Sequence, residues 1–354
     1  MNEKHPAYLK ALTFPRFVLA MLVVIFHFGL HLPLFSESYF SEVFKHGAVA
    51  VSFFFFLSGL VLAYNYDNRT SPREFLLKRL FRIYPIYLAS FLAVLISFYL
   101  INKDLTDLFR VFMNALGLQA WMPGYALEIN FPAWSISVEF FLYSTFPLLL
   151  YFFSKIQWKR FATVSICVII LGWIEHYCAV NYLYEPDRFF VGQFILYFPL
   201  FHFTTFLAGF LCGKWIVRMK EKRFQNFLFS ALSLLGIVLF ILILNFDNPL
   251  RIYAHNGGLI PVFALICCGL ALDRKIFTPL FGSPYLIYLG NISYGIYMWQ
   301  FPVFIWYSQW TGESQLSGLN FLFYILILTL WGSLSFEFIE KPIRRKLSRN
   351  FLAV

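Results

Sequence analysis

The sequence predicts an all-α integral membrane protein with about ten transmembrane helices and both termini in the cytoplasm. Its 354 residues are 60% hydrophobic and only 13% charged, whereas soluble proteins carry about 25% charged residues. The apolar residues gather in runs of roughly 20, the length that an α-helix needs to cross a bilayer. Lys and Arg concentrate in alternate connections between these runs, a pattern typical of multi-pass membrane proteins.

Ten apolar runs qualify as membrane spans. They cover approximately residues 13–32, 47–65, 83–101, 132–153, 161–180, 199–217, 226–245, 258–272, 285–306 and 319–339. The connection 102–131 also holds a semi-apolar stretch, Leu108–Trp121, which is interpreted as an interfacial or re-entrant helix rather than another span. Since the sequence shows no internal repeat, low-complexity segment or linker, residues 1–354 are expected to form a single membrane domain.

The basic residues support this topology and explain the net charge of +10. With a cytoplasmic N-terminus, few of the 28 Lys and Arg residues fall in outer segments: Lys45, Lys103, Arg110, Arg188 and Arg251. The positive charge therefore follows from orientation in the membrane. No nucleic acid partner is predicted, because this topology accounts for the charge without one.

The first span contains two polar side chains, Arg16 and His27, in the stretch Phe14–Phe28. Eleven residues of helix return within about 20° of the starting direction and rise about 16 Å, so both side chains share one face. Ionisable residues inside a membrane usually face a protein interior or a water-filled cavity, which favours a polar path along this face. Alternatively, Arg16 snorkels to the cytoplasmic surface and His27 reaches the outer interface.

A carboxylate, Glu139, lies about two turns inside the span 132–153, which starts on the outer side. His27, near the outer end of the first span, is expected at a comparable depth. An imidazole and a carboxylate at matched depth are the parts of a general-base dyad. A metal site formed by His27, His31 and Glu139 is not favoured, because Pro33 indicates that the helix has ended and no H-E-x-x-H pattern is present.

Three other segments carry further signals. Arg79 and Arg82 stand at i, i+3 where the chain re-enters the membrane, and they suit either a phosphate-bearing ligand or anionic lipid headgroups. Gly47 and Gly59 in the second span favour close packing of helices. The ninth span bears a polar stripe that either lines a ligand cavity or bonds neighbouring helices: Asn291, Ser293, Tyr294, Tyr297 and Gln300.

Six motifs, in this order, resemble the acyltransferase 3 family of bacterial multi-pass membrane acyltransferases over nearly the whole chain. They are Arg-x10-His (Arg16, His27), the Phe-Phe-x-Leu-Ser-Gly stretch (Gly47, Phe53–Leu57, Ser58, Gly59), Arg-x-x-Arg-Ile-x-Pro (Arg79, Arg82, Ile83, Pro85), Trp-Ser-x-Ser-x-Glu-x-x-x-Tyr (Trp134, Ser135, Ser137, Glu139, Tyr143), Ser-Tyr-x-x-Tyr (Ser293, Tyr294, Tyr297) and Glu-x-Pro (Glu340, Pro342). One departure is Gln300, where family members often have a histidine.

The resemblance implies a membrane-bound O-acyltransferase of the bacterial cytoplasmic (inner) membrane. It would move a short acyl group, mostly acetyl, from cytoplasmic acyl-CoA to a hydroxyl of a cell-surface or exported glycan or glycolipid, such as lipopolysaccharide. His27 and Glu139 are the expected catalytic residues, while Arg16, Arg79 and Arg82 would bind the CoA phosphates. Substrate-binding roles are expected for the side chains of Trp134, Ser135, Ser137 and Tyr294. Acyl-CoA is the expected co-substrate, membrane lipids are expected partners, and no metal is expected.

The alternative is a proton-coupled transporter or flippase in which His27 and Glu139 form a proton relay. Paired inverted repeats would favour it, and the sequence shows none. The two classes differ in a simple property. An acyltransferase binds CoA or slowly hydrolyses acetyl-CoA, whereas a transporter does neither.

Overall fold

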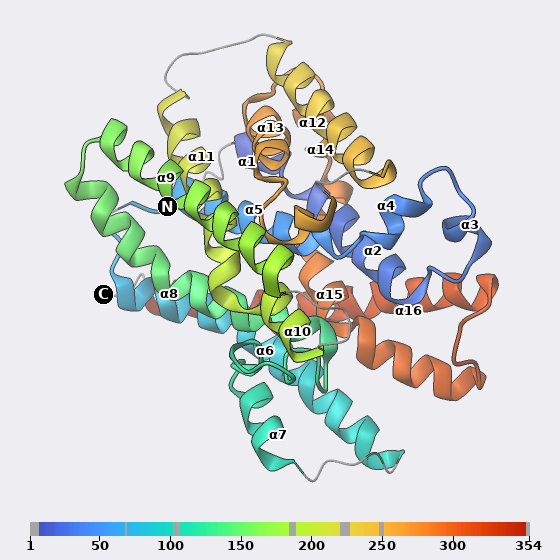
Figure 1. Ribbon diagram of the computed structural model, residues 1–354. Helices are drawn as coiled ribbons and strands as arrows, with labels where there is room; N and C mark the ends of the chain where they lie inside the picture. Colours follow the sequence, from blue (N-terminus) through green and yellow to red (C-terminus); the bar gives the residue numbers. More distant parts are fainter. Residues whose placement is uncertain are drawn as a thin grey trace. The chain divides into compact units, whose positions relative to one another are not determined.

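The computed structural model describes residues 7–67, 69–101, 103, 107–183, 189–219, 227–247 and 251–351. All regular secondary structure in these residues is helical, and none is strand (Figure 1). The prediction of an all-α protein is therefore confirmed.

Six helical segments of the described residues are long and apolar enough to cross a membrane. They are Pro72–Leu100, Phe131–Lys155, Trp158–Leu183, Phe190–Met219, Leu228–Asn245 and Gly318–Lys346. Three shorter apolar helices, Phe14–Phe28, Val49–Asn65 and Ile260–Leu272, and the helix Pro284–Thr311 match the remaining predicted spans. The exact number of ten and the cytoplasmic termini stay predictions.

The chain divides into two compact units, each built from three separate stretches. Unit 1 comprises Met1–Asp67, Phe152–Tyr177 and His202–Ser293, and unit 2 comprises Asn68–Tyr151, Cys178–Phe201 and Tyr294–Val354. The helix α15 (Pro284–Thr311) contributes to both, and the last four residues of α8 (Trp134–Lys155) belong to unit 1. The expectation of a single domain over residues 1–354 stays a prediction.

Unit 1 contains most of the N-terminal and central helices. They are α1 (Ala7–Lys10), α2 (Phe14–Phe28), α3 (Pro33–Ser36), α4 (Ser41–Lys45), α5 (Val49–Asn65), α9 (Trp158–Cys178), α11 (Phe203–Met219), α12 (Leu228–Asn245), η6 (Arg251–Asn256), α13 (Ile260–Leu272) and α14 (Phe277–Phe281).

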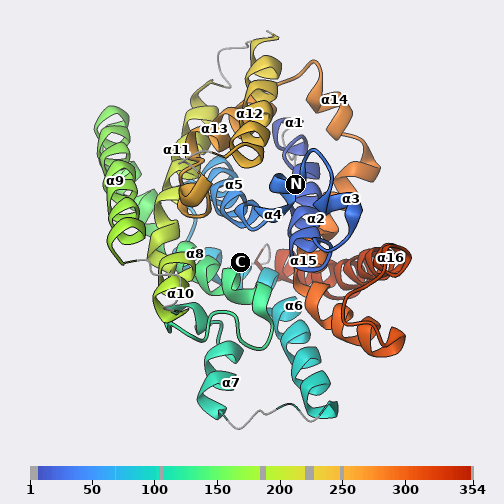
Figure 2. The ribbon, with the colours of Figure 1, turned by 45° about the vertical axis from the view of Figure 1, so that its right-hand side comes forward.

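The centre of unit 1 is the helix pair α5 and α11, which lie side by side (Figure 2). Glycines allow this approach: a Cβ atom on Gly59 would lie 2.1 Å from the carbonyl oxygen of Phe206, and one on Gly209 would lie 2.0 Å from that of Phe56. A Cβ atom on Gly47 would meet Leu22 and Phe26 of α2 at 2.7 Å. The prediction that small residues of the second span serve close packing is confirmed.

Unit 2 contains the remaining helices. They are α6 (Pro72–Leu100), α7 (Leu108–Ala115), η1 (Gln119–Trp121), η2 (Phe131–Ala133), α8 (Trp134–Lys155), η3 (Ala179–Leu183), α10 (Phe189–Tyr197), η4 (Pro199–His202, whose last residue belongs to unit 1), the second part of α15, α16 (Gly318–Ser335), η7 (Phe336–Glu340) and α17 (Lys341–Phe351).

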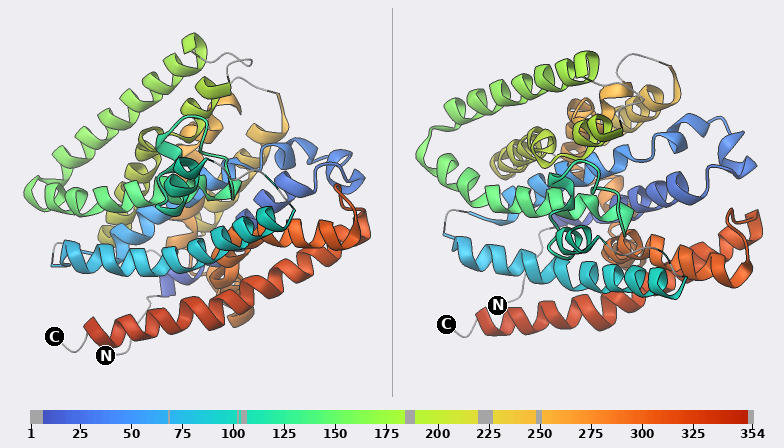
Figure 3. Two further views of the ribbon diagram at one scale, coloured as in Figure 1. Left: turned by 90° about the horizontal axis from the view of Figure 1, so that it is seen from below. Right: turned by 60° about the horizontal axis from the view of Figure 1, so that its bottom comes forward.

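Two long helical rods organise unit 2. The helices α16, η7 and α17 follow one another as one rod, and α6 packs beside its second half (Figure 3). The core between α6 and α15 is formed by Phe91, Val94, Phe98, Ile129 and Ile305. The predicted stretch 108–121 forms the eight-residue α7 and the single turn η1. At about 1.5 Å per residue, α7 is too short to cross a bilayer.

Candidate active site

In unit 1, α2 carries Arg16 in its first turn and His27 in its last turn. The helix is continuous between them, so the predicted shared face and separation of about 16 Å hold for ideal geometry. Pro15 suits the first turn, and the N–H of Gly29 donates to the carbonyl of Ile25 where the helix ends. Both polar side chains are half-buried. An ionisable pair thus lines one face of an otherwise apolar helix.

The end of α2 decides the geometry of the second histidine. His31 lies beyond the helix, and Pro33 opens the separate helix α3, as the sequence predicted. His27 and His31 therefore do not share a helical face. Within the described residues, no group of three His, Cys, Asp or Glu side chains has a geometry that suits a metal ion.

In unit 2, Glu139 lies in the second turn of α8 and is half-buried. The hydroxyl of Tyr143, one turn later, donates to Glu139 Oε2 at 3.4 Å. The ring of Tyr143 packs edge-on against Phe75 of α6, with 6.5 Å between centroids. This hydrogen bond orients the Glu139 carboxyl along its own helix.

The two arginines that were expected to bind phosphate lie inside α6. This helix begins at Pro72, eleven residues before the predicted span, so about three turns that precede the apolar run are also helical. The guanidinium of Arg79 lies over the Phe75 ring, 5.6 Å from its centroid. Arg82, one turn later, is half-buried as Arg79 is. The two donor groups therefore occupy one face of a rigid helix.

The start of α8 places the side chains that were expected to bind substrate. Trp134 is buried, and its ring centroid lies 4.8 Å from that of Tyr197. The hydroxyl of Ser135 donates to the carbonyl of Pro132 at 3.2 Å, and Ser137 Oγ accepts the N–H of Ala120 at 3.3 Å. Both serine hydroxyls thus hold the backbone around this turn.

Tyrosines of α15 connect these parts of unit 2. The hydroxyl of Tyr294 donates to the carbonyl of Ile83, directly after Arg82, at 2.8 Å. The hydroxyl of Tyr297 donates to the carbonyl of Pro132, also at 2.8 Å. Of the two interpretations of the polar stripe in this span, helix bonding therefore applies to both tyrosines. Within unit 2, Tyr294 therefore contacts the part of α6 that carries Arg82, and Tyr297 contacts the turn before α8.

Gln300 and Glu340 are fixed by their own helices. The amide of Gln300 is buried and donates to the carbonyl of Tyr297 at 2.8 Å. Glu340, in the Glu-x-Pro motif, is buried and forms an ion pair with Arg344 one turn later. Each of these bonds lies within a single helical segment, where it fixes the side chain.

One residue that the sequence did not reveal is Asn130. It is buried, and its Nδ2 donates to Ser90 Oγ at 3.2 Å and to the carbonyl of Met298 at 3.3 Å. It thereby joins α6, α15 and the segment before α8. Its neighbour Ile129 has a φ of +60°, a conformation rare for a β-branched residue. A polar residue in a loop gives no periodic signal, so pattern analysis does not detect such an anchor.

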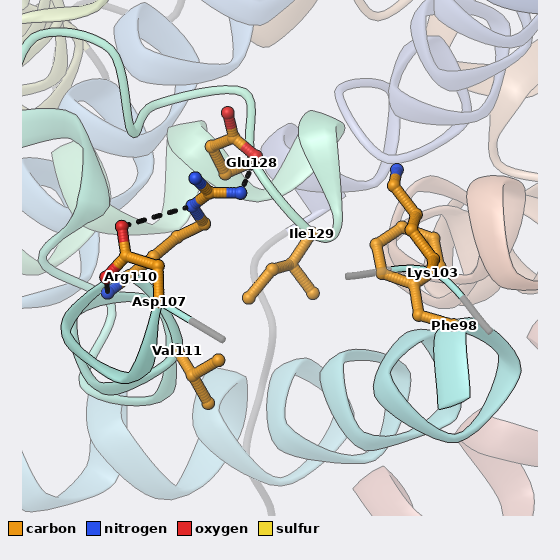
Figure 4. A pocket seen from close by; sticks show the side chains of 7 residues that line it. All are labelled: Phe98, Lys103, Asp107, Arg110, Val111, Glu128 and Ile129. Carbon is orange, nitrogen blue, oxygen red and sulfur yellow. Dashed lines mark hydrogen bonds and ion pairs between the residues drawn. The ribbon is translucent and has the colours of Figure 1, made fainter. Parts of the chain in front are cut away.

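A small cavity lies beside this segment. Figure 4 shows Arg110 of α7 between Glu128, at 3.3 Å, and Asp107, at 3.6 Å. The cavity volume is about 20 Å³, room for about one water molecule. It is too small for a substrate, and its ion pairs fix α7 against the loop that leads to α8.

Comparisons with known proteins identify the family. The family model described as an acyltransferase domain matches residues 9–338. The acyltransferase MdmB of Streptomyces mycarofaciens is 26% identical over 337 residues, which are 86% of this chain and 82% of MdmB. A putative O-acetyltransferase of Staphylococcus aureus is 22% identical, covering 85% of this chain and 53% of the relative.

A third relative is the putative peptidoglycan O-acetyltransferase YrhL of Bacillus subtilis, 23% identical over 86% of this chain and 52% of YrhL. The chain thus spans about half the length of the two O-acetyltransferases. No solved structure matches the chain. The resemblance drawn from the six motifs is confirmed: the chain belongs to the acyltransferase 3 family, and it is an acyltransferase whose described residues include several helices long and apolar enough to cross a membrane.

Proposed function

We propose that the protein transfers a short acyl group, acetyl in the simplest case, from cytoplasmic acyl-CoA to a hydroxyl of a cell-surface or exported glycan. Family membership supports the acyl transfer. The name of YrhL, a putative peptidoglycan O-acetyltransferase, supports a glycan as the acceptor class. The bacterial inner membrane is the compartment in which a cytoplasmic donor and an exported acceptor are both accessible.

One observation carries the proposal: α2 presents Arg16 and His27 on one face of an otherwise apolar helix. In the predicted topology Arg16 lies near the cytoplasm and His27 near the outer side. A CoA molecule bound through its phosphates near Arg16 would extend its thioester along this face toward His27. A helix that served only as a membrane anchor would have no need for an ionisable residue at its far end.

Arg79 and Arg82 are proposed to complete the phosphate site. Guanidinium groups give two parallel hydrogen bonds to a phosphate, and CoA carries a pyrophosphate and a ribose phosphate. Both residues lie near the first turns of α6, which is predicted to begin at the cytoplasmic surface. The bond between Tyr294 and the carbonyl of Ile83 fixes the segment that carries them.

His27 is the proposed general base. It accepts the proton of the acceptor hydroxyl while the hydroxyl oxygen forms a bond to the thioester carbonyl carbon. The carbon–sulfur bond then breaks, the proton passes from the imidazolium to the CoA sulfur, and the products are an ester and free CoA. General-base catalysis of this kind contributes about 10²–10⁴-fold to the rate. Glu139, whose carboxyl accepts a hydrogen bond from Tyr143, is proposed to stabilise the imidazolium.

The start of α8 is the proposed acceptor site. The hydroxyl oxygens of Ser135 and Ser137 retain hydrogen-bonding capacity beyond their backbone contacts, since a hydroxyl has one donor and two acceptor positions. The ring of Trp134 offers an apolar wall of the kind that a sugar face contacts. Tyr294 would contribute from α15, near the arginine segment.

The test uses purified protein in detergent with acetyl-CoA and measures the release of free CoA. We expect slow hydrolysis by the wild type and a decrease of about 10²-fold or more in His27→Ala. The matched control is His31→Ala, which removes an exposed histidine four residues later and outside α2. Release of CoA at equal rates by wild type and His27→Ala would contradict the role of His27.

A further inference from the structure

A groove between α15 and α16 is lined by none of the residues assigned above to the candidate active site. Its volume is about 350 Å³, within the range of small-molecule sites. The lining residues are Val303, Trp306, Tyr307, Trp310, Ile327 and Trp331. Apart from the hydroxyl of Tyr307 and the indole nitrogens, all these side chains are apolar. The surface therefore suits a hydrocarbon.

Aromatic contacts hold the walls of this groove in place. The ring centroids of Trp306 and Trp331 lie 5.5 Å apart, and Trp331 stacks on Trp299 at 5.2 Å. The indole N–H of Trp306 donates to Ser97 Oγ of α6 at 2.8 Å. Since three helices fix the tryptophans, the groove is preformed, which lowers the entropic cost of binding.

The groove opens beside a surface that faces lipid. Leu322, Leu326 and Leu330 are 55%, 56% and 58% exposed, and their spacing places them in one row along α16. Ile327 and Trp331 directly follow two of these leucines, about 100° further around the helix. In a membrane protein such an exposed apolar row contacts the hydrocarbon core of the bilayer. A lipid chain can therefore reach the groove from the side.

Hydrogen bonds connect Tyr307, which lines the groove, to a negatively charged residue, Glu313. The hydroxyl of Tyr307 donates to Asn320 Oδ1 at 3.1 Å, and Asn320 Nδ2 donates to Glu313 Oε1 at 2.7 Å. The N–H of Ser317 donates to Glu313 Oε2 and lowers the pKa of this carboxyl, so it is ionised at neutral pH. Glu313 is the only charged residue in the sequence between Lys275 and Glu337.

We propose that this groove binds the hydrocarbon chain of a glycolipid whose uncharged sugar contacts Asn320 and Glu313, beyond Tyr307. Sugar hydroxyls donate hydrogen bonds to a carboxylate and an amide, whereas the phosphate of an anionic phospholipid is repelled by Glu313. In the predicted topology this end of α15 is on the outer side of the membrane. The proposal rests on the proposed function in one respect: if the protein acylates a glycan, the bound glycolipid carries the hydroxyl that is acylated.

The test is photo-crosslinking of the full chain in phosphatidylcholine nanodiscs. The probe is decyl glucoside with a diazirine at the end of its decyl chain. We expect adducts on the groove residues of α15 and α16, and competition by unlabelled decyl glucoside but not by phosphatidylglycerol. Equal competition by phosphatidylglycerol, or adducts confined to the exposed leucine row of α16, would overturn the proposal.

Two adjacent substitutions sharpen the test. Ile327→Trp fills the groove and should lower specific labelling by about tenfold, whereas Leu326→Trp adds the same side chain on the lipid-facing row and should leave labelling unchanged. Trp310→Ala, which removes an exposed wall residue, serves as a second variant and should also lower labelling. Equal effects of the Ile327 and Leu326 substitutions would refute the assignment.

Failure of this proposal is distinguishable from failure of the proposed function. Labelling requires no acyl-CoA, so it tests the groove even in a protein that does not release CoA from acetyl-CoA. Conversely, Ile327→Trp should release CoA at the wild-type rate, since Ile327 belongs to no part of the proposed active site. Loss of both labelling and CoA release in this variant would count against a separate lipid groove.

Discussion

The hydroxyl of Tyr297 donates a hydrogen bond of 2.8 Å to the carbonyl of Pro132, and Ser135 donates to the same oxygen. This bond joins the middle of α15 to the turn that begins α8. Five residues into α8, Glu139 accepts from Tyr143. The position of the carboxylate in unit 2 therefore depends on a tyrosine in a distant part of the sequence.

Tyr297→Phe removes this bond without changing the volume of the buried ring. Because the Pro132 carbonyl keeps its bond from Ser135, we expect a loss of only about 1 kcal/mol in stability. Activity should fall further than stability, since the start of α8 is no longer fixed. Thermal unfolding in detergent and release of CoA from acetyl-CoA measure the two effects. Unchanged values of both would show that the bond has no positioning role.

The arginines of α6 are testable with lysine substitutions. Arg79→Lys and Arg82→Lys keep the charge but lose the planar pair of donors, so each should weaken CoA binding by about tenfold. Calorimetric titration with CoA measures this change. Arg73→Lys, at an exposed position in the first turn of α6, is the matched control and should bind CoA as the wild type does. Equal affinities in all three variants would remove α6 from the phosphate site.

The hydrogen bonds of Asp273 predict that the protein loses stability in acid. It follows α13 directly and is buried. Burial alone would raise its pKa, but hydrogen bonds from the Ser230 hydroxyl and from the backbone N–H groups of Thr278, Ile276 and Phe277 outweigh this effect and lower the pKa below its ordinary 3.8.

A carboxyl whose pKa is lower in the folded state stabilises the protein above its unfolded pKa, and this contribution is lost as the pH falls through the folded pKa. We therefore expect the melting temperature of the wild type to decrease when the pH is lowered below about 4. Asp273→Asn should be destabilised at neutral pH and less sensitive to acid. The melting temperatures of the two proteins are compared between about pH 3 and 7, a range chosen around the ordinary carboxyl pKa. The same dependence of melting temperature on pH in both proteins would contradict this account.

The glycine contacts of unit 1 predict a sharp difference between two alanine substitutions. A Cβ atom on Gly209 would lie 2.0 Å from the Phe56 carbonyl oxygen, so Gly209→Ala must force α5 and α11 apart. Overpacking of this kind costs about 1–3 kcal/mol. Gly318→Ala meets open space, and no atom lies within 4 Å of its Cβ position. Size-exclusion chromatography with a fluorescent tag measures the amount of folded protein. We expect clearly more folded protein for Gly318→Ala than for Gly209→Ala.

The sequence was sufficient to locate the helices, because lipid requires long apolar runs and each run leaves a local signal. It underestimated α6, whose first turns contain Arg73, Lys78, Arg79 and Arg82. A count of apolar residues excludes such turns, although the Glu74–Lys78 ion pair at 2.5 Å favours a helix there.

For the site, the sequence predicted only which side chains take part and that His27 and Glu139 lie at a similar depth in the membrane. The backbone contacts of Ser135 and Ser137, and the anchor Asn130, depend on segments far apart in the sequence. No periodic pattern encodes such contacts. The division of α15 between two units has the same origin, because it follows from long-range packing.

The most direct test of the central claim is the O-acyl content of cell-surface glycans, measured by mass spectrometry in a deletion strain. The strain is complemented with wild type, His27→Ala or His31→Ala at equal expression. We predict that wild type and His31→Ala restore an acyl mark and that His27→Ala does not. Restoration by His27→Ala to the wild-type level would contradict the assignment of His27 as the base for acyl transfer.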